Sequence, residues 1–265
     1  MNTTIGWAAG FAMLVWWFTT GIILFLDGLA PATFRRSMAG ATVLGLGALY
    51  WLYASGADTS PAGAYTAFGA AIMLWGWLEM SFLMGFITGP RKQPYRGVRG
   101  GWRHFRQATG AIIYNELATL SAAALVFVAT RHAANHVALW TFLVLWSMRL
   151  SAKLNLFLGV ANTGSQFLPP HLAYLESFFN KRRMNLLFPI SILGSTVVLV
   201  LLVQKLCVVE DGFEVTGYAL TASLLALAIL EHWFMVLPIP TEKLWDWGTR
   251  YAAHRRGPRA VAKSP

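Results

Sequence analysis

Residues 136–161 read HVALWTFLVLWSMRLSAKLNLFLGVA. This run exceeds the roughly 20 mostly apolar residues that an α-helix needs to cross a bilayer. It is continuously apolar, whereas strands of a membrane barrel alternate between apolar and polar residues. The two charged side chains that interrupt it, Arg149 and Lys153, lie four residues apart and therefore on one helix face. The stretch predicts a membrane-spanning helix with charges inside the membrane.

Six further stretches share this length and apolar character. Turn and helix-breaking residues separate them, including Asp27-Gly28, Gly89-Pro90 and Pro169-Pro170. The sequence therefore predicts an all-α, polytopic membrane protein with seven transmembrane helices. Their expected ranges are 5–26, 37–54, 62–88, 105–130, 136–161, 184–209 and 215–237.

The composition of the chain favours a membrane protein as well. Of the 265 residues, 56% are hydrophobic and 12% are charged, about half the charged fraction of an ordinary soluble domain. The single cysteine, Cys207, excludes a disulfide framework and a Cys-based metal site within the chain. The net charge of +10 is not read as a nucleic-acid site, because its distribution has a simpler explanation.

Most of the basic residues fall on one side of the predicted helices. Along the alternating loops, that side receives 17 of the 21 lysines and arginines. The positive-inside rule then places the N-terminus outside and the C-terminus in the cytoplasm. We expect a multi-pass membrane protein in contact with the lipid bilayer.

Two segments outside the helices carry much of this charge. We expect a transmembrane domain over residues 1–240, followed over 241–265 by an interfacial helix and a basic, disordered tail. The basic loop, residues 89–106, is explained by cytoplasmic retention and lipid headgroups. The alternative is docking of an acidic partner, for which the candidates are Arg91, Lys92, Arg96, Arg99 and Arg103.

Ionisable residues inside the predicted helices are the most informative feature. Each charged one costs roughly 2.5–3.5 kcal/mol if it stands alone at a helix centre, so partners are expected. The topology places them in the inner half of the membrane, on four helices. A second polar stripe on the fifth helix contains Asn155 and continues to Asn162. The ionisable set is Glu79, Glu116, Arg149, Lys153, Glu231 and His232.

Three interpretations of this set remain open. It is a network of ion pairs that stabilises the helix bundle, a pocket for the polar group of a ligand or pigment, or a metal site. For a ligand, the candidates are the six ionisable residues with Asn155 and Asn162. A metal would use Glu79, Glu116, Glu231 and His232, fewer ligands than the four acids and two histidines of typical di-iron bundles. No motif of a known enzyme class is present.

Several segments resemble one protein family. They include Glu79 with Phe82-Leu83-Met84-Gly85, Tyr114-Asn115-Glu116-Leu117-Ala118, the stretch from Arg149 to Asn162, and Glu231-His232-Trp233-Phe234. With these residues the chain resembles the PuhE-type photosynthetic complex assembly proteins of purple phototrophic bacteria, from the first helix to about Trp247. The resemblance implies an integral inner-membrane protein, encoded with reaction-centre genes.

The same resemblance implies a function. We expect a factor that assists assembly of the reaction centre and light-harvesting complex, handling bacteriochlorophyll, a precursor of it, or nascent subunits. The implied partners are reaction-centre or antenna subunits and other assembly factors. Catalysis is not expected. The alternatives are a membrane-embedded, metal-dependent oxidase acting on a tetrapyrrole and a small-molecule transporter.

Overall fold

The computed structural model describes residues 2–239, 241–245 and 247. Seven long α-helices account for most of this part of the chain, and short 3-10 helices connect some of them. The α-helices are α1 (Asn2–Asp27), α2 (Phe34–Ala54), α3 (Pro61–Leu83), α4 (Gly101–Thr130), α5 (Val137–Leu158), α6 (Leu187–Val208) and α7 (Gly212–Phe234). The 3-10 helices are η1 (Pro31–Thr33), η2 (Ser55–Ala57), η3 (Ser165–Phe167), η4 (Pro170–Phe178) and η5 (Thr241–Trp245).

The seven helices of the described part are all long and apolar enough to cross a membrane. This confirms the all-α fold class and the seven predicted spans. No β-strand occurs in the described ranges; pairing is limited to one isolated parallel bridge between Val160 and Lys181. The protein is therefore a multi-pass membrane protein.

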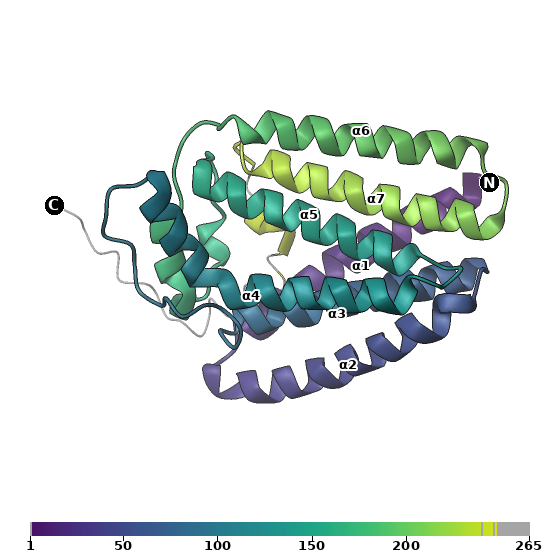
Figure 1. The fold of residues 1–265 in the computed structure, drawn as a ribbon, viewed down its shortest axis with the longest axis horizontal. Coiled ribbons are helices and arrows are strands. Elements are labelled where there is room, and N and C mark those ends of the chain that lie inside the picture. The colour runs from purple at the N-terminus through teal and green to yellow at the C-terminus, as the bar shows by residue number, and fades with distance from the viewer. Residues whose placement is uncertain (1, 240, 246, 248–265) are drawn as a thin grey trace.

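The helices lie side by side along the long axis of the molecule (Figure 1), with α6 at one edge and α2 at the other. Helices α3 and α7 form the centre of the bundle. In the most apolar segment of each, 56% of the residues are buried, against 11% in α6. Phe68, Leu220 and Leu224 are almost fully buried there. Helix α5 packs against α3, α4 and α7, as expected for a helix with two polar stripes.

Helix α3 ends at Leu83, five residues before the predicted Thr88. The cause is a Schellman motif, in which Gly85 has φ +80°, Gly85 N donates to Phe82 O (2.9 Å) and Phe86 N to Ser81 O (2.9 Å). Glycine takes this left-handed conformation without steric cost. The apolar pattern hid the helix end, because Phe86 and Ile87, which follow Gly85, are also apolar.

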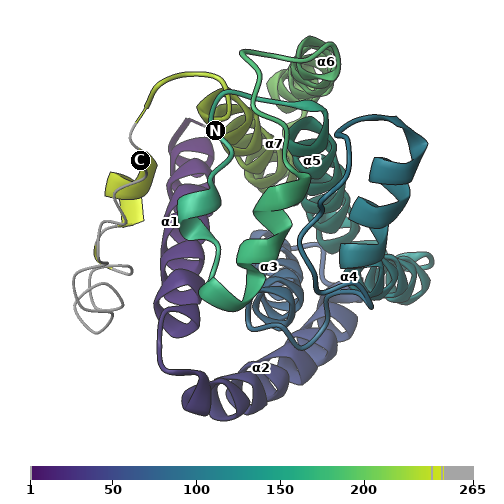
Figure 2. The same ribbon diagram turned by 90° about the vertical axis from the view of Figure 1, so that its left-hand side faces the viewer.

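The linker between α5 and α6 crosses one end of the bundle. We call residues 159–185 the strap. Viewed from that end, its 3-10 helices lie across the middle of the molecule, between α1 on one side and α4 on the other (Figure 2). The strap begins at Gly159, which has φ +122°. Helix α5 ends there, although the apolar run continues to Ala161, as far as the predicted helix did.

Replacing Gly159 with alanine should lower the free energy of unfolding by about 1–3 kcal/mol, because φ +122° is strained for a residue with a Cβ atom. The new Cβ would also lie 2.9 Å from Arg182 Cγ and Cδ. Gly194→Ala is the matched control, since a Cβ at Gly194 meets no atom within 4 Å. Thermal unfolding in detergent measures both variants. A melting temperature of Gly159→Ala equal to that of Gly194→Ala would contradict the role given to Gly159.

The basic loop and the strap lie at the same end of the bundle, where α4 begins and α7 ends, and α1 begins at the opposite end (Figure 1). This grouping agrees with the predicted separation of charge. Which end faces the cytoplasm stays a prediction from the positive-inside rule.

The segment after α7 returns to α1. Trp17 Nε1 donates to Leu244 O (2.9 Å) and Trp245 Nε1 donates to Trp17 O (3.2 Å). The Trp247 ring stacks on Phe18, with 6.0 Å between centroids. The described part of the predicted interfacial helix is thus a 3-10 turn against α1. The rest of that helix and the predicted tail, 248–265, lie outside the described residues, and the division at residue 240 stays a prediction.

Candidate functional site

A cavity of about 1190 Å³ lies inside the bundle, beneath the strap. Its walls come from α1, α3, α4, α5 and α7, and the strap and the segment after α7 complete it. Seven of the eight ligand-binding candidates line this one cavity: Glu79, Glu116, Arg149, Lys153, Asn162, Glu231 and His232. Four of them, on α3, α5 and α7, are within the last two turns of their helices: Glu79, Lys153, Glu231 and His232. The helix ends therefore bring distant positions together.

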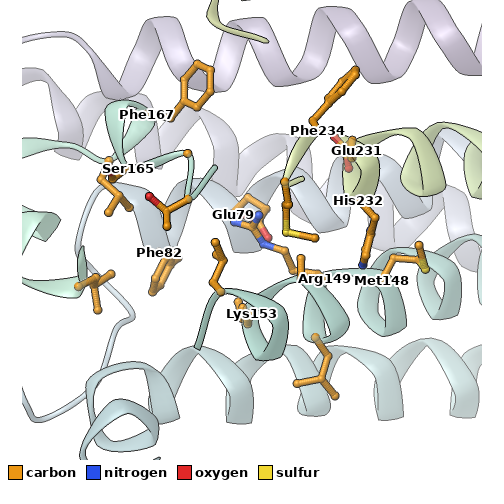
Figure 3. Close-up of a pocket in the computed structure, with 18 of the residues that line it drawn as sticks. Glu79, Phe82, Met148, Arg149, Lys153, Ser165, Phe167, Glu231, His232 and Phe234 are labelled. Carbon is orange, nitrogen blue, oxygen red and sulfur yellow. Dashed lines mark hydrogen bonds and ion pairs between the residues drawn. The ribbon is translucent and has the colours of Figure 1, made fainter. Parts of the chain in front are cut away.

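Arg149 and Glu79 form an ion pair at the centre of the cavity (Figure 3). Arg149 Nη2 donates to Glu79 Oε2 at 2.6 Å, a charge-assisted hydrogen bond from α5 to α3. The Glu79 side chain is 16% exposed and that of Arg149 is 41% exposed. Because Arg149 lines the cavity, its partly exposed side chain is available to a ligand.

Lys153, one turn further along α5, pairs with α4. Its Nζ donates to Glu116 Oε1 at 2.6 Å, and the two side chains are 18% and 22% exposed. Nζ also lies 5.6 Å from the centroid of the Phe82 ring, within the range of a cation–π interaction. The one charged face of α5 thus contacts acids on two different helices.

Glu231 is the third acid of the cavity, and its hydrogen-bond donor is neutral. Trp16 Nε1 on α1 donates to Glu231 Oε1 at 3.0 Å. Within the described residues no salt bridge involves Glu231. Its hydrogen-bond partner is therefore an indole N–H and not a cation.

The five charges form one electrostatic cluster. Lys153 interacts electrostatically with Arg149, Glu116 and Glu79. Glu231 interacts with Arg149 and Glu79. The acids outnumber the bases by one, so the cluster carries a net charge of −1 when His232 is neutral and the others are ionised.

His232 is only 2% exposed, and both its ring nitrogens have partners. Nδ1 lies 2.9 Å from Ala228 O, so it carries a proton and donates, while Nε2 lies 2.9 Å from Ser151 Oγ. Ser151 Oγ in turn lies 2.9 Å from Ser191 Oγ on α6. This histidine therefore links α7, α5 and α6 and has no free nitrogen for a ligand.

Asn155 is fully buried and does not line the cavity. Its amide donates to Ser151 O at 3.0 Å, and its Oδ1 accepts from Asn185 Nδ2 at 3.0 Å. Asn162, in contrast, contacts the cavity and connects the strap to the end of α7. Its backbone N donates to Met235 O (2.8 Å), and its Nδ2 donates to Phe234 O (3.0 Å) and to Leu237 O.

Comparison with known proteins gives the family. Residues 2–256 match a family described as "Protein of unknown function (DUF3623)". This chain belongs to the DUF3623 family. A protein of Rhodobacter capsulatus, named "Uncharacterized 30.4 kDa protein in puhA 5'region", is 40% identical over 239 residues, which cover 89% of this chain and 87% of that protein. No solved structure matches the chain.

The metal interpretation lacks a ligand cluster in the described part of this DUF3623 protein. There, no three His, Cys, Asp or Glu side chains are grouped so that they could hold a metal ion. Glu79 and Glu116 bind Arg149 and Lys153, and both nitrogens of His232 are occupied. The four candidate ligands share a cavity, but in the described residues they are not grouped as a metal site requires.

The sequence analysis missed three residues that shape the site of this DUF3623 protein. Trp16 lies in the first apolar run with no motif to distinguish it, yet it is the donor to Glu231. Asn185 holds Asn155 and Gly159 together, and Ser191 completes the contact from α6. Asn185 is the second residue of the sixth predicted range, 184–209, and Ser191 also lies within it. These two polar residues in an apolar run were the available signals.

The partner-docking candidates in the basic loop differ in exposure. Lys92, Arg96, Arg99 and Arg103 are exposed. Arg91 is half-buried, with its guanidinium carbon 5.8 Å from the centroid of the Phe178 ring in the strap. Four cations thus remain open to a partner, while Arg91 also anchors the loop to the strap. Docking stays a prediction.

Proposed function

We propose that this protein is an inner-membrane factor that assists assembly of the photosynthetic reaction centre and light-harvesting complex. In this proposal it binds bacteriochlorophyll, a precursor of it, or part of a nascent subunit in the cavity beneath the strap. The C-terminus and the basic loop face the cytoplasm, where the loop contacts anionic lipids or acidic partner subunits. Two independent lines support this function.

The first line is the family. The Rhodobacter capsulatus relative is named for its position in the 5′ region of puhA, and the resemblance to PuhE-type proteins implies genes that lie with those of the reaction centre. Such a neighbourhood supports a role connected with the photosynthetic complex.

The second line is the cavity, which is the observation that carries the proposal. Seven of the eight candidate residues line a partly open cavity of about 1190 Å³, a volume above the usual range of roughly 300–1,000 Å³ for small-molecule sites. Its walls are largely apolar, with aromatic residues such as Trp75 and Phe167. Polar groups inside the membrane are by default a functional-site hypothesis. A pigment with polar substituents on an apolar ring suits such a wall.

Deletion of the gene in a purple phototrophic bacterium tests the function. We expect fewer assembled complexes per cell, measured by the near-infrared absorbance of isolated membranes, and recovery when the wild-type gene is returned. Unchanged complex levels and unchanged pigment content after deletion would refute the proposed function. Glu214→Gln, an exposed position on α7, should restore assembly as well as the wild type does.

A further inference from the structure

The charges around the cavity restrict the class of ligand that fits. Three carboxylates and three cationic side chains, Arg149, Lys153 and Lys181, line it, so the lining charges balance. Lys181, at the strap, is 67% exposed and lies 3.7 Å from Glu176. Arg149 and Lys153 already donate to Glu79 and Glu116 at 2.6 Å, so a carboxylate or phosphate entering this low-dielectric space would lose its hydration and meet the three acids without an unpaired buried cation beside it. The cavity therefore disfavours anionic ligands.

A cationic ligand meets a different obstacle. Glu79 and Glu116 already have cationic partners at 2.6 Å. Glu231 accepts from Trp16 and lies within electrostatic range of Arg149. A further cation would give this balanced set of lining charges a net positive charge and would lie near Arg149.

Hydrogen-bond donors are in excess on the cationic side chains. A guanidinium has five N–H donors and an ammonium group has three. Within the described residues, Arg149 and Lys153 each donate one side-chain hydrogen bond. Because the exposed part of Arg149 faces the cavity, neutral acceptors such as carbonyl oxygens can bind there without adding charge.

We propose that the cavity binds an uncharged, hydrophobic ring compound whose carbonyl oxygens accept hydrogen bonds from Arg149 and Lys153. This inference rests on the proposed function only in taking the cavity as the binding site. Two sources share the chemistry: an esterified tetrapyrrole and an isoprenoid quinone. The histidine of the cavity contributes no metal–ligand bond, since both its nitrogens are occupied.

Binding to purified protein in lipid nanodiscs tests the ligand class. The probes are bacteriochlorophyll a, its free acid bacteriochlorophyllide a, ubiquinone-10, oleate and dodecyltrimethylammonium. We expect the esterified pigment to bind at least about tenfold more tightly than the free acid, equivalent to ~1.4 kcal/mol. Saturable binding of bacteriochlorophyll a or of ubiquinone-10 identifies the source. Equal or tighter binding of the free acid, oleate or the ammonium amphiphile would overturn the proposal.

Glu231→Gln provides a test in which binding is gained. Removing this carboxylate leaves two acids and three cations among the lining residues, so the preference for ester over free acid should fall to within about threefold, a loss of most of the ~1.4 kcal/mol discrimination. A misfolded variant cannot produce tighter binding of an anion. Glu214→Gln, exposed on the same helix, is the matched control and should keep the wild-type ratio. An unchanged ratio in Glu231→Gln would refute the electrostatic argument.

Failure of this inference and failure of the proposed function give different results. If deletion of the gene leaves complex levels unchanged, the assembly function is refuted, whatever the purified protein binds. If deletion lowers complex levels while the purified protein prefers anionic probes, the ligand class alone is refuted.

Discussion

Lys153→Met should lower the free energy of unfolding by about 3–5 kcal/mol, the cost of leaving one partner of a buried ion pair without the other. Its partner Glu116 accepts from Nζ at 2.6 Å, and both side chains are less than a quarter exposed. Methionine preserves the length and the apolar stem of lysine, so the change isolates the charge. Unfolding of the purified protein in mixed micelles and its abundance in membranes are the measurements.

The double variant Lys153→Met/Glu116→Gln separates the pair from the side chains themselves. Removing both charges together should restore most of the lost stability, because no unpaired carboxylate remains in the membrane. If the losses of the two single variants simply add in the double variant, the pair does not stabilise the bundle.

The second ion pair, Arg149–Glu79, should contribute less to the free energy of unfolding. Arg149 is 41% exposed, so the cavity screens the interaction more than it screens Lys153–Glu116. We therefore expect Arg149→Met to destabilise less than Lys153→Met. The comparison also bears on the interpretation of the cluster: a purely structural network would respond in proportion to burial, whereas a ligand site would also lose binding of the neutral probes in Arg149→Met.

Asn185→Ala should lower the free energy of unfolding by about 2–4 kcal/mol. Asn185 Oδ1 accepts from Leu187 N (2.8 Å) and Phe188 N (3.2 Å) at the start of α6. Loss of such a cap costs ~1 kcal/mol. Its Nδ2 donates to Asn155 Oδ1 and to Gly159 O, and leaving buried acceptors without a donor costs a further ~1–3 kcal/mol.

Asn185→Ser distinguishes the two contributions. Serine can still accept at the start of α6, but its side chain is too short to reach Asn155. We therefore expect it to recover about 1 kcal/mol relative to alanine, the contribution of the cap, as measured by denaturant unfolding in detergent. Equal stability of the serine and alanine variants would show that the cap contributes nothing. The loss of the contact to Asn155 should also loosen the arrangement of α5 and α6 beside His232.

The seven helices could be predicted from the sequence because a bilayer imposes a length and a composition on each span. Two of the helix ends that were placed too late, at Thr88 and Ala161, show where this signal fails. Apolar residues continue past Gly85 and Gly159, and the helix stops because of backbone conformation and hydrogen bonds to segments outside it. Hydropathy predicts neither the backbone conformation at these glycines nor the hydrogen bonds that end the helices.

The sequence also identified which charges lie inside the membrane. Isolated charges are costly there, so partners for Arg149 and Lys153 had to exist, and their spacing placed both on one face of α5. Three acids were available as partners. Which acid pairs with which base depends on the rotation and depth of each helix, and the folded bundle assigns Glu79 to Arg149 and Glu116 to Lys153.

By itself, the sequence determined the membrane environment, the number of spans and the set of buried ionisable residues, because each follows from the energy of transferring a segment or a charge into lipid. The tertiary structure alone decided that these residues surround one cavity and that Trp16, not a cation, contacts Glu231. It also decided that both ring nitrogens of His232 have hydrogen-bond partners. These features depend on packing between helices far apart in the chain. Packing is a property of side-chain shape in three dimensions, which no single segment specifies.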